Sequence, residues 1–397
     1  MSDARYAIVG GGIVGLSIAY HLSRGSDAEV VVYERNEELG GETTARSGAS
    51  FGWYGDAAQR EMKRYGWRLY NEMLADPRSD AAPRYVHTGS LKLTTTEDGA
   101  RLLRSMLDSE SDTPVSKTMQ GPEDDQITYL NGEEIKQTLF APELDHEPVV
   151  GGVYRPNFGY AEPVALTYEF AARARDHGAR FELGTEIRDV TVSEGKVSSI
   201  ETPDERVAVD HVVCAAGPWN VAFADKVGID LPVGHTLGPS LRVRARDAPA
   251  TAPPLITHEE SGAFCRRNPD GTYYLGHRPR NPDVVDPYNP DEVIDDVPDD
   301  LRDIIRENIG QLIPHLADAE VIDERVAVRS DVTDDRPIIG WTSVDGFSIA
   351  AFDSSGIQLA PATGRIVADQ LLNDEPTEFY DAVSITRFDG YEDVSPW

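Results

Sequence analysis

Short apolar runs alternate with glycine turns and amphipathic stretches from the beginning of the chain. Residues 6–9 and 29–34 are apolar runs bounded by polar or turn residues, which predicts two buried strands. Between them a glycine cluster at 10–15 precedes a stretch, 16–23, with the composition of a helix. A strand, a tight turn, a helix and a second strand form a βαβ unit, which predicts a parallel sheet.

Three later segments continue this pattern. Residues 163–177 are predicted to form a helix with proline at its first position. Residues 210–216 form an apolar run that ends at a Gly-Pro pair, which predicts another buried strand. Residues 358–372 show helical apolar spacing after a turn of small residues. These segments therefore predict further strands and helices of the same α/β unit.

Two other segments, 85–150 and 235–328, have a different pattern. They carry short alternating runs, such as residues 90–94 and 272–275. Alternation with a period of two is typical of strands with one buried face, so we predict a second, interleaved domain with a mixed or antiparallel sheet. The first domain then comprises the remaining segments, 1–84, 151–234 and 329–397.

Length and apolar content fit a folded protein of two domains. The chain has 397 residues, 40% of them hydrophobic, without the uninterrupted apolar run of about 18 residues that a membrane span requires. The apolar stretch 7–22 contains a glycine cluster, so we interpret it as folded protein rather than a signal peptide. Residues 282–303 are dense in Asp and Pro, which favours a solvated loop, with a lid over a site as the alternative.

Acidic residues outnumber basic ones by a wide margin. The chain has 69 Asp and Glu against 37 Lys and Arg, a formal net charge of −32. A surface this negative repels nucleic acid and anionic lipid, so we exclude both as natural partners. Only six of the basic residues are lysines, which together with the acidic excess favours a protein adapted to a very salty cytoplasm; an ordinary acidic protein is the alternative.

The two cysteines, Cys214 and Cys265, do not form a CxxC pair. The sequence therefore indicates neither a disulfide framework nor a thiolate zinc site, and we expect no metal. A reducing cytoplasm is the compartment that fits this cysteine content best.

Gly10, Gly12 and Gly15 form a Gly-x-Gly-x-x-Gly motif between the first predicted strand and helix. Glycines at these positions permit a tight turn, close approach of the backbone to a diphosphate, and close packing of helix on strand. Glu34, nineteen residues after Gly15 at the end of the second strand, can accept hydrogen bonds from a ribose diol. Together they predict an adenine dinucleotide site and disfavour NADP, but they do not separate NAD from FAD. A structural glycine turn beside an incidental glutamate is the alternative.

Four blocks of the sequence resemble the D-amino acid oxidase superfamily, particularly its glycine oxidase and sarcosine oxidase-like members. The blocks, in family order over almost the whole chain, are the glycine motif with the loop after residue 40, residues 152–180, residues 212–219, and residues 329–340 with 354–372. The resemblance implies an α/β fold, in which a Rossmann-like FAD-binding domain with a parallel sheet accompanies an interleaved substrate domain on a mixed or antiparallel sheet. It also implies FAD as the cofactor, held noncovalently because the final block has no cysteine.

The resemblance places the cofactor contacts on the glycine motif, the loop after it, the third block and the turn before the last helix. The N-terminus of that helix would stabilise negative charge on reduced flavin, with an ordinary capped helix end as the alternative. Position 354 has serine where the family commonly has glycine. The expected FAD contacts are Gly10, Gly12, Ile13, Val14, Gly15, Glu34, Arg35, Gly41, Thr43, Thr44, Arg46, Ser47, Gly48, Ile187, Ala215, Ala216, Gly217, Trp219, Ser354, Ser355, Gly356, Ile357 and Gln358.

Arg329 aligns with the family's arginine that pairs with a substrate carboxylate, a role that suits a guanidinium fork. The family motif usually continues with proline, whereas Ser330 follows here. Neighbouring aspartates, Asp331 among them, offer a structural ion pair as the alternative. For the rest of the substrate pocket we expect aromatic and polar residues, with plain packing as the alternative for each. These residues are Phe51, Trp53, Tyr54, His258, Phe264 and Arg266.

The implied reaction is oxidation of the C–N bond of a small amine or amino acid of the glycine, sarcosine or D-amino acid class. Hydride passes to flavin N5, and the imine product is hydrolysed. Oxygen and an electron carrier both stay open as acceptor, because no lysine follows Lys226, whereas some relatives use a lysine for reaction with oxygen. Two other readings remain: a flavin dehydrogenase of a non-amine substrate such as a 2-hydroxy acid, and a flavin-binding subunit of a larger complex.

Overall fold

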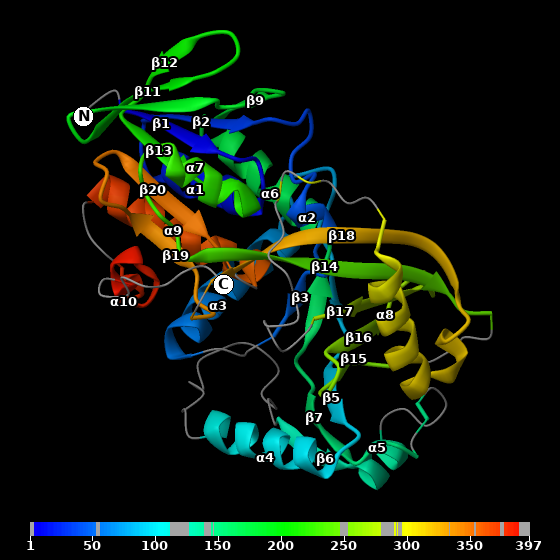
Figure 1. The fold of residues 1–397 in the computed structure, drawn as a ribbon. Coiled ribbons are helices and arrows are strands. Elements are labelled where there is room, and N and C mark those ends of the chain that lie inside the picture. Colours follow the sequence, from blue (N-terminus) through cyan, green and yellow to red (C-terminus); the bar gives the residue numbers. More distant parts are fainter. Residues whose placement is uncertain are drawn as a thin grey trace.

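Two large β-sheets, each covered by helices, organise the computed structural model of the chain (Figure 1). The structure describes residues 4–52, 56–111, 127–138, 144–145, 147–246, 253–278, 290, 292, 296–332, 334–352, 355–373 and 377–388. Within these ranges no helix is both long and apolar enough to cross a membrane.

The first large sheet has six strands and contains the predicted βαβ unit. Its strands, in spatial order, are β19 (Ile338–Trp341), β20 (Phe347–Ala351), β13 (His211–Cys214), β1 (Arg5–Val9), β2 (Glu29–Glu34) and β9 (Arg180–Leu183). All neighbours are parallel except the edge pair β19 and β20. The predicted parallel sheet is therefore confirmed.

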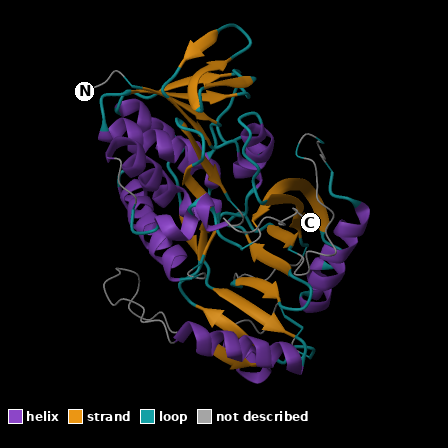
Figure 2. Ribbon diagram, turned by 60° about the vertical axis from the view of Figure 1, so that its left-hand side comes forward, coloured by secondary structure: helices purple, strands orange, loops and turns teal. Residues whose placement is uncertain are grey.

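Helices form a layer on one face of this sheet, which Figure 2 shows beside the strands. They are α1 (Ile13–Gly25), α3 (Ala57–Ala75), α6 (Pro163–Asp176) and α9 (Gly356–Asn373). α1 contacts both α6 and α9. A glycine at position 364 permits this approach, because a Cβ there would lie 2.5 Å from the Ser17 carbonyl oxygen. His21, on α1, is half-buried in the same layer, where it packs against Tyr20 and Tyr65.

The opposite face of the sheet packs on a second apolar core. Three antiparallel strands and a short helix contribute to it: β10 (Asp189–Ser193), β11 (Lys196–Glu201), β12 (Arg206–Ala208) and α7 (Asn220–Asp225). The six-stranded sheet is thus a middle layer between helices and a small sheet, the arrangement that buries parallel strands on both sides.

The second large sheet is mixed, as predicted. Its eight strands, in spatial order, are β18 (Glu320–Val332), β14 (Val233–Arg244), β17 (Tyr273–His277), β16 (Ala263–Arg267), β15 (Leu255–His258), β5 (Ser90–Thr94), β7 (Gly151–Arg155) and β6 (Thr128–Asn131). Its helices are α4 (Glu97–Ser111), α5 (Gly132–Thr138) and α8 (Asp299–Leu312). Only β15 and β5 pair in parallel among these described strands. Its apolar core lies between strands and α8.

Short elements complete the described chain. They are β3 (Ser50–Phe51), β4 (Tyr85–His87) and β8 (Gly159–Ala161), which form a three-stranded sheet, with α2 (Thr43–Arg46), α10 (Tyr380–Val383), η1 (Gly217–Trp219), η3 (Pro314–Leu316) and η4 (Ile385–Phe388).

The structure differs from the sequence analysis at two places. β7 pairs with β5 and β6 in the eight-stranded sheet, whereas the predicted boundary at residue 151 assigns it to the first domain. A few residues later β8 joins another sheet, so the chain changes layers within a turn that no change of composition marks. The predicted loop 282–303 lies largely outside the described residues, but α8 begins at Asp299, so its last residues are helical. The assignment of segments to two domains stays a prediction.

Candidate functional site

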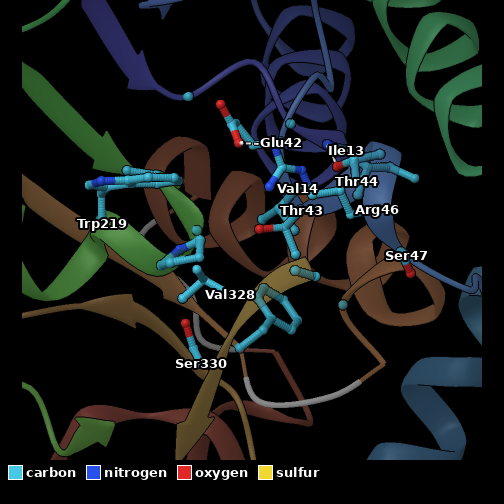
Figure 3. A pocket seen from close by; sticks show the side chains of 18 of the residues that line it. Ile13, Val14, Glu42, Thr43, Thr44, Arg46, Ser47, Trp219, Val328 and Ser330 are labelled. Carbon is cyan, nitrogen blue, oxygen red and sulfur yellow. Dashed lines mark hydrogen bonds and ion pairs between the residues drawn. The ribbon is translucent and has the colours of Figure 1, made fainter. Parts of the chain in front are cut away.

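A cavity of about 560 Å³ opens where the two large sheets meet. The glycine turn after β1, the end of β2, the loop 40–48 and the segment after β13 line it from the six-stranded sheet. Residues of β14, β17 and β18 line it from the eight-stranded sheet, and the start of α9 closes a third side. Figure 3 shows side chains from these separate elements around one space.

The glycine motif brings the N-terminus of α1 to this cavity. Gly10 has a φ of +105°, and a Cβ there would lie 2.5 Å from the Ala215 carbonyl oxygen. Gly15 does not line the cavity, because it packs directly against the Gly10 carbonyl oxygen behind it. At Gly12 a Cβ would meet only Thr44 Oγ1, at 3.6 Å, so this glycine leaves open space. An uncapped helix N-terminus facing open space suits a phosphate group.

Glu34 stands beside this turn at the end of β2. Its Oε2 accepts a hydrogen bond from the Gly11 amide at 2.7 Å, and its Oε1 accepts one from Asn36 at 2.9 Å. Both bonds fix the carboxylate at the cavity wall, and each oxygen keeps a lone pair that a ribose hydroxyl can use. The Arg35 guanidinium stacks 3.8 Å from the centre of a Trp219 ring at the same end of the cavity.

The loop 40–48 supplies polar groups along the middle of the cavity. Thr43, Thr44 and Arg46 lie on the short helix α2, and all three line the space in Figure 3. Arg46 donates a hydrogen bond to the Val326 carbonyl oxygen at 2.9 Å, which ties this loop to β18. Gly41, Ser47, Gly48, Ile187, Ala215, Ala216 and Gly217 are also brought to the lining.

A second helix N-terminus, that of α9, faces the other end of the cavity. Ser355, Gly356 and Ile357 line it, and Ser355 has a φ of +67°. The residues present therefore fit a long dinucleotide with a diphosphate at α1 and a ring that gains negative charge near α9. Gln358 differs from expectation, because it is outside the lining and its Oε1 accepts a bond from the Gly52 amide at 3.3 Å. Ser354 lies outside the described residues.

Arg329 reaches the cavity from β18 and is also part of an ion pair. Its Nη2 lies 2.9 Å from Asp331 Oδ1, and the Thr236 hydroxyl donates to the other oxygen of Asp331. The aliphatic part of the Arg329 side chain packs over Gly238, where an added Cβ would lie 3.1 Å from Arg329 Cδ. Arg329 thus lines the cavity and also forms the ion pair that the sequence analysis gave as the alternative, while its role toward a substrate carboxylate stays a prediction.

Aromatic and polar residues of β16 and β17 complete this end. Phe264 packs its ring over Gly276, which has no Cβ to obstruct it, and lies 5.8 Å from the Tyr274 ring. Tyr274 in turn contacts Gly48 across the cavity wall. Burial lowers the pKa of His277, and its Nδ1 has no hydrogen-bond partner among the described residues.

Three residues expected in the substrate pocket are placed elsewhere. Phe51 is 4% exposed and packs edge-on against Trp67, Tyr70 and Tyr85 in the helical core. His258 is buried at the far end of β15, where its Nδ1 lies 2.8 Å from the Ser261 hydroxyl.

Arg266 lies behind the cavity wall rather than in it. It stacks on Tyr160, with the guanidinium carbon 3.7 Å from the ring centre, and donates to the Gly48 carbonyl oxygen. It therefore supports the wall that Tyr274 and Gly48 form. Trp53 and Tyr54 lie outside the described residues.

Sequence reasoning missed Tyr274, Arg278 and Lys226, all of which line the cavity. The alternation in 272–275 marks Tyr274 as lying on the opposite face from the buried Tyr273, but it does not say which face meets a ligand. No feature of the sequence singles out Lys226. Among the described residues no group of His, Cys, Asp or Glu could hold a metal ion.

Comparisons with known proteins identify the family of the chain. The sequence profile of the FAD dependent oxidoreductase (DAO) family matches residues 5–370. The chain is 23% identical to mitochondrial dimethylglycine dehydrogenase from Mus musculus over 412 residues, covering 94% of this chain and 43% of that protein. It is 24% identical to glycine oxidase from Bacillus subtilis (strain 168) over 382 residues, covering 93% of each. The chain thus spans less than half the length of the dimethylglycine dehydrogenase that it matches.

Solved structures share the fold. Glycine oxidase from Bacillus cereus ATCC 14579 has a TM-score of 0.79 at 21% identity, covering 96% of this chain and 98% of that one. L-proline dehydrogenase from P. horikoshii has a TM-score of 0.80 at 20% identity, covering 98% of each. With the profile match over most of its length, the chain belongs to the FAD dependent oxidoreductase family, and FAD is its cofactor.

Proposed function

We propose that this chain oxidises the C–N bond of a small amine or amino acid. The observation that carries the proposal is the position of Arg329, which lines the same cavity as the N-terminus of α9. A carboxylate held by Arg329 would keep a small amino acid at the end of the cavity where the resemblance expects the flavin. FAD, when bound, supplies the hydride acceptor, and water hydrolyses the imine that the substrate becomes.

The chain's own residues have three tasks in this proposal. Arg329 binds and orients the substrate through its carboxylate, which turns the reaction into one between positioned partners. Phe264 and Tyr274 cover that end of the cavity with aromatic surface and exclude water. The amides at the start of α9 stabilise the negative charge that the cofactor gains.

A noncovalent cofactor is part of the same proposal. Cys214 and Cys265 are both buried, and neither lines the cavity. Cys214 donates to Asn220 Oδ1 at 3.1 Å, and burial raises the pKa of its thiol to about 12, so it is a poor nucleophile. Two buried thiols also agree with the reducing cytoplasm that we propose as its compartment.

Anaerobic reduction of the flavin tests the function. We would purify the protein in high salt, record its flavin spectrum, and add sarcosine, glycine, proline and both enantiomers of alanine in turn, with lactate as a 2-hydroxy acid. Bleaching by an amine but not by lactate is the expected result, and air then separates an oxidase from a dehydrogenase. Bleaching by lactate alone would contradict the proposal. Acid precipitation should leave the flavin in the supernatant.

A further inference from the structure

We propose that Asp331 is a specificity-determining residue that makes the cavity select substrates with one carboxylate over substrates with two. It acts through Arg329, whose charge it neutralises and whose orientation it fixes. The inference rests on the proposed function, in which Arg329 binds the substrate carboxylate, and it adds which carboxylic acids this chain accepts.

The geometry gives Arg329 a defined orientation. Arg329 and Asp331 lie two residues apart on β18, hence on the same face, with Nη2 and Oδ1 2.9 Å apart. Thr236, which stands opposite Arg329 on β14, donates its hydroxyl to the second oxygen of Asp331. Both oxygens of the carboxylate are therefore held, one by the guanidinium and one by the neighbouring strand.

The guanidinium of Arg329 contacts Asp331 on one side and lies at the cavity wall. Arg329 and Ser330 line the cavity, whereas Asp331 does not. Asp331 is the one acidic partner of Arg329 in the described part of the chain. Because Gly238 has no Cβ, the aliphatic part of the Arg329 side chain has room to lie over it. One edge of the guanidinium thus faces Asp331, and its other donors remain for a ligand in the cavity.

Charge then decides which ligands fit. The side chains of Arg329 and Asp331 are only 23% and 17% exposed, so solvent screens their charges weakly. Their sum is zero, and one substrate carboxylate can still use the free donors of Arg329. A second carboxylate in the same small space meets the negative charge of Asp331 without a free cation to offset it. Of the other arginines that line the cavity near β17 and β18, Arg46 is paired with Glu42 at 3.7 Å, and Arg278 is exposed just after β17 and is therefore strongly screened.

Two dead-end ligands separate these cases. (Methylthio)acetate and thiodiacetate replace the amine nitrogen of an N-substituted glycine by sulfur, so they carry one and two carboxylates but no oxidisable C–N bond. Titrating each into the FAD-loaded protein and following the flavin absorbance gives two dissociation constants. We expect the wild type to prefer the monoacid, and Asp331→Asn to reduce that preference about tenfold, as expected for removal of one partly buried charge.

Matched variants separate charge from structure. Asp323→Asn removes the same charge from the same strand, in an exposed i,i+2 pair with Arg325, and should leave the preference unchanged. Asp331→Glu should keep the preference, because it keeps the charge. Asp331→Thr is the second neutral variant if the asparagine variant does not fold, and it should behave as Asp331→Asn.

The outcomes distinguish the two proposals. If both ligands bind the wild type and every neutral variant at position 331 keeps the wild-type preference, the role of Asp331 is overturned while the proposed function stands. An Asp323→Asn variant that changes the preference equally would also overturn it, since the effect would then be general. If neither ligand perturbs the flavin of the wild type, Arg329 is not a carboxylate anchor and the role of Asp331 is overturned, while reduction of the flavin by an amine decides the proposed function separately.

Discussion

The glycines of the Gly-x-Gly-x-x-Gly motif meet different surroundings: Gly12 caps α1, whereas Gly15 lies in its first turn. A methyl group at Gly15 would collide with the Gly10 carbonyl oxygen, so Gly15→Ala should destabilise the protein even without cofactor. A methyl group at Gly12 meets no protein atom nearer than 3.6 Å, but it enters the space in which we place the diphosphate. Gly12→Ala should therefore keep the stability of the apoprotein and weaken FAD binding by about tenfold or more.

Urea unfolding of the apoprotein and titration of FAD fluorescence measure the two effects separately. The Gly15 variant should show both lower stability in urea and weaker FAD binding, whereas the Gly12 variant should show only weaker FAD binding. Wild-type FAD affinity in the Gly12 variant would show that the diphosphate does not approach the start of α1.

At the scale of elements, a half-buried histidine joins α1 to α3. His21 lies with its Nδ1 2.8 Å from the Ser17 carbonyl oxygen and its Nε2 3.0 Å from the Tyr65 hydroxyl. Burial lowers the pKa of His21 from 6.5 to about 4. Between these pH values the histidine is neutral in the folded protein and protonated in the unfolded chain. The stabilising contribution of neutral His21 should therefore be complete above pH 6.5 and be lost as the pH falls towards 4. Over that range this residue should lower the free energy of unfolding by about 3 kcal/mol.

Urea unfolding between pH 7 and pH 4 checks this prediction. His21→Gln should cost stability at pH 7 and flatten the fall at lower pH. A part of the fall should remain, because burial also lowers the pKa of His211 to about 4. His87→Gln on β4, an exposed position, is the control and should follow the wild-type curve. Parallel curves for all three proteins would contradict the role of His21.

The elements that the sequence predicted are those that neighbouring residues determine. The glycine turn, the helix after it and Glu34 lie within one βαβ unit, so spacing alone placed them correctly. The substrate end depends instead on register between distant strands. Arg329 meets Gly238 and Thr236 only because β18 pairs with β14 over their whole length. Asp331 is two residues from Arg329 in the sequence, so the sequence analysis could name it as an ion-pair partner. Thr236 lies on a distant strand, and spacing along the chain does not encode the register that brings it close.

At the scale of the whole molecule, the charge of −32 sets a condition for folding. Many described arginines lie in ion pairs with exposed acids, for example Arg242 with Asp270 and Arg365 with Glu378. Such exposed pairs add little stability each, and 69 acidic residues far exceed the basic ones that can pair with them. Repulsion among the remaining carboxylates opposes the compact state, and salt shortens its range from about 30 Å at 0.01 M to about 3 Å at 1 M.

We therefore predict that the folded, FAD-loaded state requires high salt. The midpoint of thermal unfolding should rise by roughly 10 °C or more between about 0.1 M and 2 M KCl, and FAD should dissociate at the lower concentration. KCl is the salt of choice, because sulfate would also strengthen apolar burial and confuse the two effects. Sucrose at matched osmolality is the uncharged control and should not replace KCl at low ionic strength. If the midpoint of thermal unfolding does not change with KCl, or if sucrose raises it equally, the prediction is wrong. The chain would then be an ordinary acidic protein, whose carboxylates are far enough apart for their repulsion to be small in dilute buffer.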